Sequence, residues 1–199
     1  MRIGGAETNA IHIVGKAITR LREQHPGITY YIGSGADYDI FDSLDRGQLD
    51  FALVVPPVNK GKYNWLLLPI RDELGFLIPK DHPLAEKERI RPDDLRDIPV
   101  QIGGDALRRQ GEGTVWAEVT DRLDVAVRFN LVTNPALLLE DGVGCCLSVR
   151  TLMNETPDGP AVCRPLEPKL EIEIYLIWQK YQVMSRPARL FLEELERVI

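Results

Sequence analysis

Two successive series of alternating strand and helix patterns determine the fold class of this chain. In the first series, at the start of the chain, short apolar runs alternate with stripes of apolar residues spaced three or four positions apart, the period of a helix. The expected strands are 2–5, 28–32 and 51–55, and the expected helices have their first apolar residues at Ile11 and Ile40. This order is typical of parallel α/β packing, because a crossover must return the chain before the next parallel strand.

The second series starts after about Ile70. Apolar residues between 125 and 131 alternate with polar or small ones, which is the clearest strand pattern in the sequence. Asn134 and Pro135 are typical of the N-cap and the first position of a helix, and Gly142 is a suitable end. The other expected elements are strands at 65–70, 74–78, 100–102 and 145–149, a helical turn at 93–95 and a helix over 115–123.

The last stretch of the chain must pack on an earlier part. A strand over 172–178 is followed by Ser185, the expected N-cap of a final helix. One strand and one helix cannot bury an apolar face alone, so we expect two lobes, with the chain crossing between them near Ile70 and near Pro168. Two crossings form a hinge, and the groove between the lobes becomes the expected ligand site. The apolar face of the final helix consists of Ala188, Phe191, Leu195 and Val198.

Composition and charge exclude several classes of protein. The chain has 199 residues, of which 44% are hydrophobic, and a formal net charge of -6. A chain of this length can bury a substantial core, whereas its negative balance disfavours direct binding to nucleic acid, which needs clustered Lys and Arg. No apolar stretch reaches the roughly 20 residues needed to span a bilayer, and the start of the chain lacks the features of a secretory signal. We therefore expect a cytoplasmic protein with no membrane association.

Polar residues follow the expected strands at the points where helices begin. In an α/β lobe, the loops at the carboxyl ends of strands meet the amino ends of helices, whose N–H groups can bind ligands. Thr8 and Asn9 in the first lobe, with Thr133 and Asn134 in the second, occupy such positions, and we expect them to bind a small polar ligand. The alternative is that they only cap helices, the commonest use of these residue types. Weaker candidates in similar loops are Ser34, Gly35 and Gly103.

These loops are compatible with more than one ligand charge. Helix amino ends favour an anion, but Glu7 and Asp39 lie in the same loops and would repel one. An anion would therefore need Arg108, Arg109 or Arg150 close by, whereas a neutral ligand or one with both charges would not.

No sequence pattern indicates catalysis, a metal site or a cofactor. His12, His25 and His82 are scattered and match no nucleophile or metal-ligand spacing. Cys145 and Cys146 are adjacent within an apolar strand, where small core residues are more common than redox switches. We therefore expect no catalytic residue, no bound metal and no cofactor.

Seven sequence strings together resemble the effector-binding domain of LysR-type transcriptional regulators. They follow the order and spacing of that family over nearly the whole chain. The resemblance implies the type 2 periplasmic-binding-protein fold, an α/β architecture of two Rossmann-like lobes with a double crossover hinge. Lobe I would be 1–70 plus 169–199, and lobe II 71–168. The strings are RIGG with ETN in 2–9, HPGI at 25–28, LDRGQLDFALV at 44–54, IPKDHPLA at 78–85, DLRDIPV at 94–100, LLEDGVGCCL at 138–147, and IYLIWQK with RPARLFLEEL in 174–195.

The resemblance also implies roles for individual residues. Thr8 falls where the family has a ligand-contacting Ser or Thr at the start of its first helix, and Thr133 falls where lobe II offers another polar contact. Asn9, Gly35 and Asn134 border those positions.

The chain departs from the family pattern at three positions. Glu7 replaces a residue that is often small, which argues against an ordinary carboxylate effector. Cys145 and Cys146 replace aliphatic residues, which hints at thiol sensing. The peroxide sensors of the family have their paired cysteines elsewhere, so this hint has little weight.

A ligand-sensing regulatory domain is the function that the resemblance implies. Ligand binding would change the lobe angle and repack an oligomer, and an N-terminal winged helix-turn-helix outside the given sequence would bind DNA. The expected homodimer or tetramer uses Ile11–Gln24 and 28–32 of lobe I against 114–123 of lobe II. Two alternatives share the fold: a solute-binding receptor of a transporter, which would be monomeric and exported, and an enzyme, for which the sequence offers no convergent acid and base.

Overall fold

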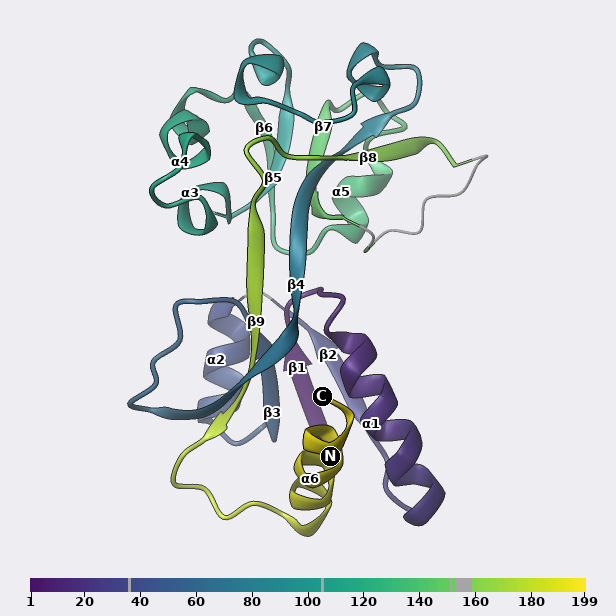
Figure 1. Ribbon diagram of the computed structural model, residues 1–199, viewed down its shortest axis with the longest axis vertical. Helices are drawn as coiled ribbons and strands as arrows, with labels where there is room; N and C mark the ends of the chain where they lie inside the picture. Colours follow the sequence, from purple (N-terminus) through teal and green to yellow (C-terminus); the bar gives the residue numbers. More distant parts are fainter. Residues whose placement is uncertain (36, 105, 151, 153–158) are drawn as a thin grey trace. The chain divides into compact units, whose positions relative to one another are not determined.

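The computed structural model describes all residues of the chain except 36, 105, 151 and 153–158, and it contains two compact units (Figure 1). Unit 1 consists of Met1–Arg71 and Glu173–Ile199, and unit 2 is the continuous segment Asp72–Ile172. The chain passes from one unit to the other twice, within strand β4 (Tyr63–Pro79) and within strand β9 (Glu171–Gln179).

Unit 1 is built on a mostly parallel sheet. Strand β1 (Arg2–Gly5) lies between β2 (Tyr31–Ser34) and β3 (Phe51–Val54) and runs parallel to both. Strand β9 is antiparallel to β3. All four residues of β3 are buried, which explains why this strand is a continuous apolar run in the sequence.

Helices α1 (Ile11–Gln24), α2 (Asp37–Asp45) and α6 (Arg186–Val198) belong to unit 1. Helix α1 packs against α6, and α2 packs against β3. The side-chain oxygen of Ser185 accepts a hydrogen bond from the N–H of Ala188 at 3.3 Å. The predicted N-cap of the final helix is therefore confirmed.

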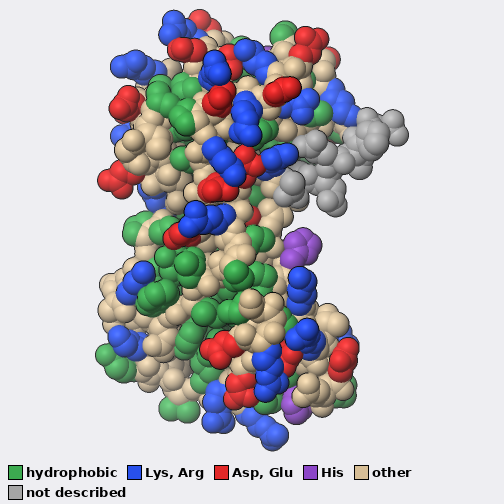
Figure 2. Space-filling model, in the orientation of Figure 1, with side chains coloured by type: hydrophobic (Ala, Val, Ile, Leu, Met, Phe, Trp, Pro, Cys, Tyr) green, Lys and Arg blue, Asp and Glu red, His purple; other side chains and the backbone are tan. Residues whose placement is uncertain are grey.

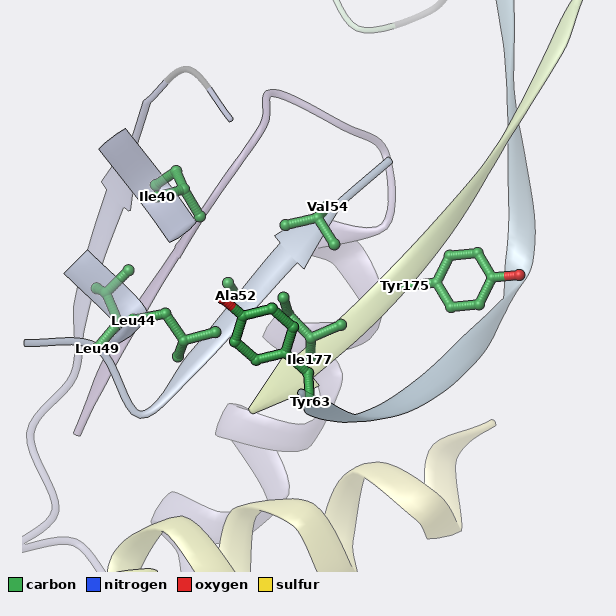
Figure 3. Close-up of a cluster of buried hydrophobic side chains, with 8 residues drawn as sticks. All are labelled: Ile40, Leu44, Leu49, Ala52, Val54, Tyr63, Tyr175 and Ile177. Carbon is green, nitrogen blue, oxygen red and sulfur yellow. The ribbon is translucent and has the colours of Figure 1, made fainter. Parts of the chain in front are cut away.

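The last strand and helix complete the core of unit 1. Phe191 of α6 is fully buried, and its ring centroid lies 5.2 Å from that of Phe51 in β3. A second buried cluster joins α2, β3, β4 and β9 (Figure 3). The last strand and helix therefore pack against the first strands and complete their core. The residues of the second cluster are Ile40, Leu44, Leu49, Ala52, Val54, Tyr63, Tyr175 and Ile177.

Unit 2 repeats the parallel arrangement. Strand β5 (Val100–Gly103) lies between β6 (Val125–Phe129) and β7 (Cys145–Val149), parallel to both. Strand β4 extends into this unit, where it pairs antiparallel with β7 and with β8 (Ala161–Pro165). The helices are α3 (Ala106–Gln110), α4 (Val115–Val119) and α5 (Thr133–Leu137), with 3-10 turns η1 (Pro83–Glu86), η2 (Pro92–Leu95) and η3 (Thr120–Arg122).

The apolar runs at 65–70 and 74–78 form one strand, β4, so the prediction of two strands is wrong. Polar residues between the runs suggested a break. In the structure Arg71 is exposed and ion-paired with Glu173 at 2.9 Å, whereas the next residue, Asp72, is buried, and the strand continues through both charged positions.

Other boundaries also differ from the prediction. Residues 28–30 lie before β2, because the N–H of Ile28 bonds to the carbonyl oxygen of His25 at 3.1 Å and completes the turn after α1. The helix expected over 115–123 is divided into α4 and η3. Helix α3 and strand β8 had no counterpart in the prediction.

Candidate functional site

The ends of β1 and β2 bring the candidate residues of unit 1 to one edge of its sheet. Gly5 is paired with Ser34 and with Leu53 in the neighbouring strands. The N–H of Gly35 donates to the carbonyl oxygen of Gly5 at 3.1 Å, which continues the register past the strands. The N–H of Ala6 donates to the carbonyl oxygen of Leu53, also at 3.1 Å. The loop that leads into α1 therefore leaves the sheet beside Ser34 and Gly35.

Thr8 is 3% exposed and shapes the start of α1. Its side-chain oxygen accepts a hydrogen bond from the N–H of Ala10 at 3.1 Å, and its carbonyl oxygen accepts one from Ile11 at 3.2 Å. The N-cap of α1 is Ala10, so the alternative interpretation of Thr8 and Asn9 as N-caps of this helix is wrong. Thr8 instead stabilises the turn before the helix, because its short side chain reaches the backbone two residues ahead. Asn9 is half-buried beside it.

Ser34 and Gly35 differ in their surroundings. Ser34 is exposed at the end of β2, whereas Gly35 is half-buried. A Cβ atom on Gly35 would lie 3.2 Å from Cδ1 of Ile40 in α2. A larger residue at position 35 would therefore press on α2, while Ser34 is open to a ligand.

Gly103 occupies in unit 2 the place that Gly5 occupies in unit 1. It ends the central parallel strand, β5, and is paired with Phe129 of β6. The N–H of Gly104 donates to the carbonyl oxygen of Phe129 at 3.2 Å, and the guanidinium of Arg128 donates to the carbonyl oxygen of Gly104 at 3.2 Å. These bonds fix the exit of the chain from β5.

Thr133 and Asn134 are exposed at the start of α5, which follows β6 at the same edge of the sheet. The N-cap of α5 is Val132, so the prediction of Asn134 as the N-cap is wrong. Val132 is buried in an apolar cluster of unit 2, and this packing anchors the start of the helix earlier than the local sequence preference indicated.

Carboxylates neutralise two of the arginines considered as anion partners. Arg108 forms an ion pair with Asp121, and Arg150 forms one with Glu73 at 2.8 Å. On the face drawn in Figure 2, Lys and Arg side chains of unit 2 are interspersed with Asp and Glu. This pairing favours a neutral polar ligand over a simple anion.

Two buried polar residues in the parallel strands of unit 2 were missing from the sequence-based set. Gln101 lies in β5 and Ser148 in β7, and both are buried. Each is a polar residue inside an apolar run, and this exception to the pattern is the sign that could have identified them.

Burial keeps the thiols of Cys145 and Cys146 protonated. Desolvation raises the pKa of Cys145 to about 11 and that of Cys146 to about 12. Leu77 of β4 pairs with Cys146 on one side and with Cys163 on the other, so a whole strand separates these two residues. Two strand spacings amount to roughly 9–10 Å between Cα atoms, beyond the reach of a disulfide. The arrangement supports core residues rather than a redox pair.

Neither a cluster of metal-ligating side chains nor a membrane-spanning helix is found in the described part of the chain. Among those residues, no group of three or more His, Cys, Asp or Glu side chains is placed to hold a metal ion. None of the helices formed by them is both long and apolar enough to cross a membrane.

Comparison with known proteins decides the family. A sequence profile described as the LysR substrate binding domain matches residues 1–199. The chain belongs to this family. It is an effector-binding regulatory domain of the LysR type, and the family is one of transcriptional regulators rather than of enzymes.

Named relatives of this LysR domain are regulators. The probable RuBisCO transcriptional regulator of Cyanophora paradoxa is 23% identical over 201 residues, which cover 97% of this chain and 62% of the relative. The probable hydrogen peroxide-inducible genes activator of Mycobacterium avium is 30% identical over 152 residues, covering 73% of this chain and 45% of the relative. The LysR domain thus spans about three-fifths of the first relative's length.

Solved structures confirm the predicted fold class, the type 2 periplasmic-binding-protein architecture. The effector binding domain of QuiR in complex with shikimate has a TM-score of 0.83 at 21% identity, covering 99% of this chain and 95% of that one. The regulatory domain of CcmR from Synechocystis, in complex with 2-PG, has a TM-score of 0.77 at 20% identity, covering 100% and 96%.

Proposed function

We propose that the LysR domain senses a small polar metabolite at the carboxyl edges of its two parallel sheets, and that a DNA-binding domain elsewhere in the full protein responds in the cytoplasm. The supporting observation is the repeated arrangement of the two units. In each, a glycine ends the central parallel strand, Gly5 in β1 and Gly103 in β5, and a polar segment leads into a nearby helix. The edge beyond the carboxyl ends of strands is the usual ligand position in such sheets.

Seven residues are proposed to contact the metabolite. Two relatives of the family are seen with the small polar molecules shikimate and 2-PG, which supports a ligand of that size and polarity. The half-buried Glu7 and the paired arginines favour a ligand with neutral hydroxyl or amide groups. The proposed contacts are Thr8, Asn9, Ser34 and Gly35 in unit 1, and Gly103, Thr133 and Asn134 in unit 2.

Removing the threonine hydroxyls is expected to weaken metabolite binding. Thr8→Val and Thr133→Val should each reduce the affinity by about tenfold, and the double variant by about a hundredfold, because each substitution removes one hydrogen bond to the ligand. Thr8→Val also removes the hydrogen bond from the N–H of Ala10 that stabilises the turn before α1. Isothermal titration with a panel of polyols, carboxamides, hydroxy acids and phosphorylated acids, including shikimate and 2-PG, measures the affinities.

The control is Gln48→Met, at an exposed polar residue before β3 that lies outside both the proposed contacts and the proposed oligomer surface. It should bind the same compounds as the wild type. Unchanged affinity in the Thr8→Val/Thr133→Val double variant would show that the proposed contacts are wrong.

We also propose that the domain forms a homodimer or tetramer through Ile11–Gln24 and 28–32 against 114–123 of a second copy. Apolar side chains on the first two segments support this: Ile11 is 36% exposed, Tyr31 55% and Ile32 46%. Such residues near a sheet edge are suited to contact another protein surface.

A charge in this surface is expected to dissociate the oligomer. Ile32→Lys should elute as a monomer under conditions where the wild type is a dimer or larger, as measured by size-exclusion chromatography with light scattering. Val183→Lys, at a residue that is 95% exposed in the loop before α6, should leave the oligomer intact. A wild-type chain that stays monomeric at high concentration would contradict this proposal.

A further inference from the structure

Gln101 is a buried amide whose polar atoms make no hydrogen bond to any residue that the structure describes. The residue lies in β5, the central parallel strand of unit 2, and is 0% exposed. Both its Oε1 and its Nε2 lack a partner. A buried carboxamide normally has several hydrogen bonds, and a buried amide without any is unfavourable and uncommon in a folded protein.

The surroundings of Gln101 are apolar. Its Cα partners in the neighbouring strands are Val127 and Cys146. Cys146 packs in a cluster with Val132, the N-cap of α5, and with the half-buried Phe129. Paired residues of adjacent strands point to the same face of a sheet, so Gln101 faces this cluster.

The same face leads from Gln101 to the carboxyl edge of unit 2. Side chains two residues apart in a strand share a face, so Gly103 follows Gln101 on it and Ser148 follows Cys146. At Gly103 the ring of Phe129 fills the space of the missing side chain, with its Cε2 atom 3.2 Å from the position of a Cβ. A ligand that reaches Gln101 from this edge must therefore displace the ring.

A local irregularity coincides with this position. The register between β5 and β6 shifts between Val100 and Gln101, where Val100 pairs with Val125 and Gln101 pairs with Val127. Such bulges re-aim side chains and are common beside functional sites. The extra residue, Ala126, lies in β6, so the pairing is irregular directly beside the residue that carries the unsatisfied amide.

We propose that Gln101 is a specificity-determining residue of unit 2, whose amide binds a hydroxyl or carboxamide group of the metabolite; this rests on the proposed sensing function. An amide offers both an acceptor and donors, so it is fully satisfied by a ligand group that also donates and accepts. A carboxylate would bond only to Nε2, would face Oε1 unfavourably, and would lose its hydration in an apolar setting. Ser148 adds a hydroxyl to the same buried face.

Gln101→Met tests the proposal, because Met has a similar shape and no polar group. Without ligand, the variant should melt about 3 °C or more above the wild type, since the substitution removes two unsatisfied buried groups. The binding test uses shikimate or malate, whichever the wild type binds more tightly. The variant should bind this compound at least tenfold more weakly than the wild type does. The hydroxyl-free analogues cyclohex-1-ene-1-carboxylate and succinate should bind both proteins equally. Gln48→Met, at an exposed glutamine, is the control and should change neither property.

Two results would overturn the proposal. One is a lower melting temperature of ligand-free Gln101→Met, because the amide would then have partners such as a buried water. The other is equal binding of the hydroxylated compounds to the variant and the wild type. If no compound binds the wild type, the proposed sensing function is wrong. The ligand-free melting temperatures still test Gln101: a more stable Gln101→Met variant supports an unsatisfied amide that is available to a ligand, and a less stable variant refutes the proposal.

Discussion

Gly144→Ala is expected to destabilise unit 2 by about 4 kcal/mol or more. Gly144 has a φ of 78°, a left-handed conformation that costs other residues about 1–2 kcal/mol. A Cβ atom at this position would lie 1.9 Å from the carbonyl oxygen of Pro99. Forcing extra atoms into packed structure costs a further 1–3 kcal/mol, typically, and about the upper value or more when the obstacle is backbone.

The obstacle at Gly144 cannot move without breaking the sheet. The same oxygen of Pro99 accepts the N–H of Cys145 at 3.0 Å, and Val100 and Cys145 are the paired first residues of β5 and β7. Relief of the clash would therefore disrupt the register of the two strands. Urea denaturation followed by tryptophan fluorescence measures the loss, because Trp116 of unit 2 is fully buried.

Gly142→Ala is the matched control for this prediction. Gly142 has a φ of 76°, but no atom lies within 4 Å of the position of its Cβ. Its substitution should cost only the conformational strain, about 1–2 kcal/mol. Equal losses for the two variants would show that the contact with Pro99 does not determine the requirement for glycine.

Phe191→Ala is expected to destabilise unit 1 by about 3–5 kcal/mol, the usual range for truncating a buried aromatic residue. Phe191 is fully buried, and its ring lies against Phe51 of β3. Loss of the ring would leave a cavity between α6 and the sheet, where the backbone cannot collapse fully. The free energy of unfolding from urea denaturation gives the size of the effect.

Leu192→Ala separates this packing from a general weakening of α6. Leu192 is the neighbouring residue in the helix and is only half-buried, so its truncation should cost less than about half as much. Comparable losses at positions 191 and 192 would contradict the view that one face of α6 closes the core of unit 1.

The sequence predicted those elements whose pattern of apolar residues follows directly from their burial. Strand β3 is buried throughout and is a continuous apolar run, while α6 combines an N-cap serine with an apolar face. Strand β8 was missed because its five residues include Arg164 and Pro165, and its identity as a strand comes from pairing with β4. Helix α3 is too short for its period to be detected. These two elements depend on contacts that no local pattern contains.

The edges that hold the candidate site could be predicted, but the details could not. Parallel topology places Thr8 and Thr133 beyond the ends of strands, wherever the helices start. The helix starts themselves were wrong, because buried Ala10 and Val132 take the N-cap positions through packing rather than through side-chain hydrogen bonds. Gln101 was missed because its lack of hydrogen-bond partners depends on the whole fold of unit 2.

The order of the two units along the chain has a consequence for biosynthesis. Unit 2 is one uninterrupted segment, whereas unit 1 needs residues from both ends of the sequence. During translation, every strand and helix that lies wholly within unit 2 is made before α6 exists. Unit 2 can therefore fold while β3, although synthesised before it, still lacks α6, whose Phe191 packs against Phe51. Within this domain, the strands that are made before unit 2 are covered only after it.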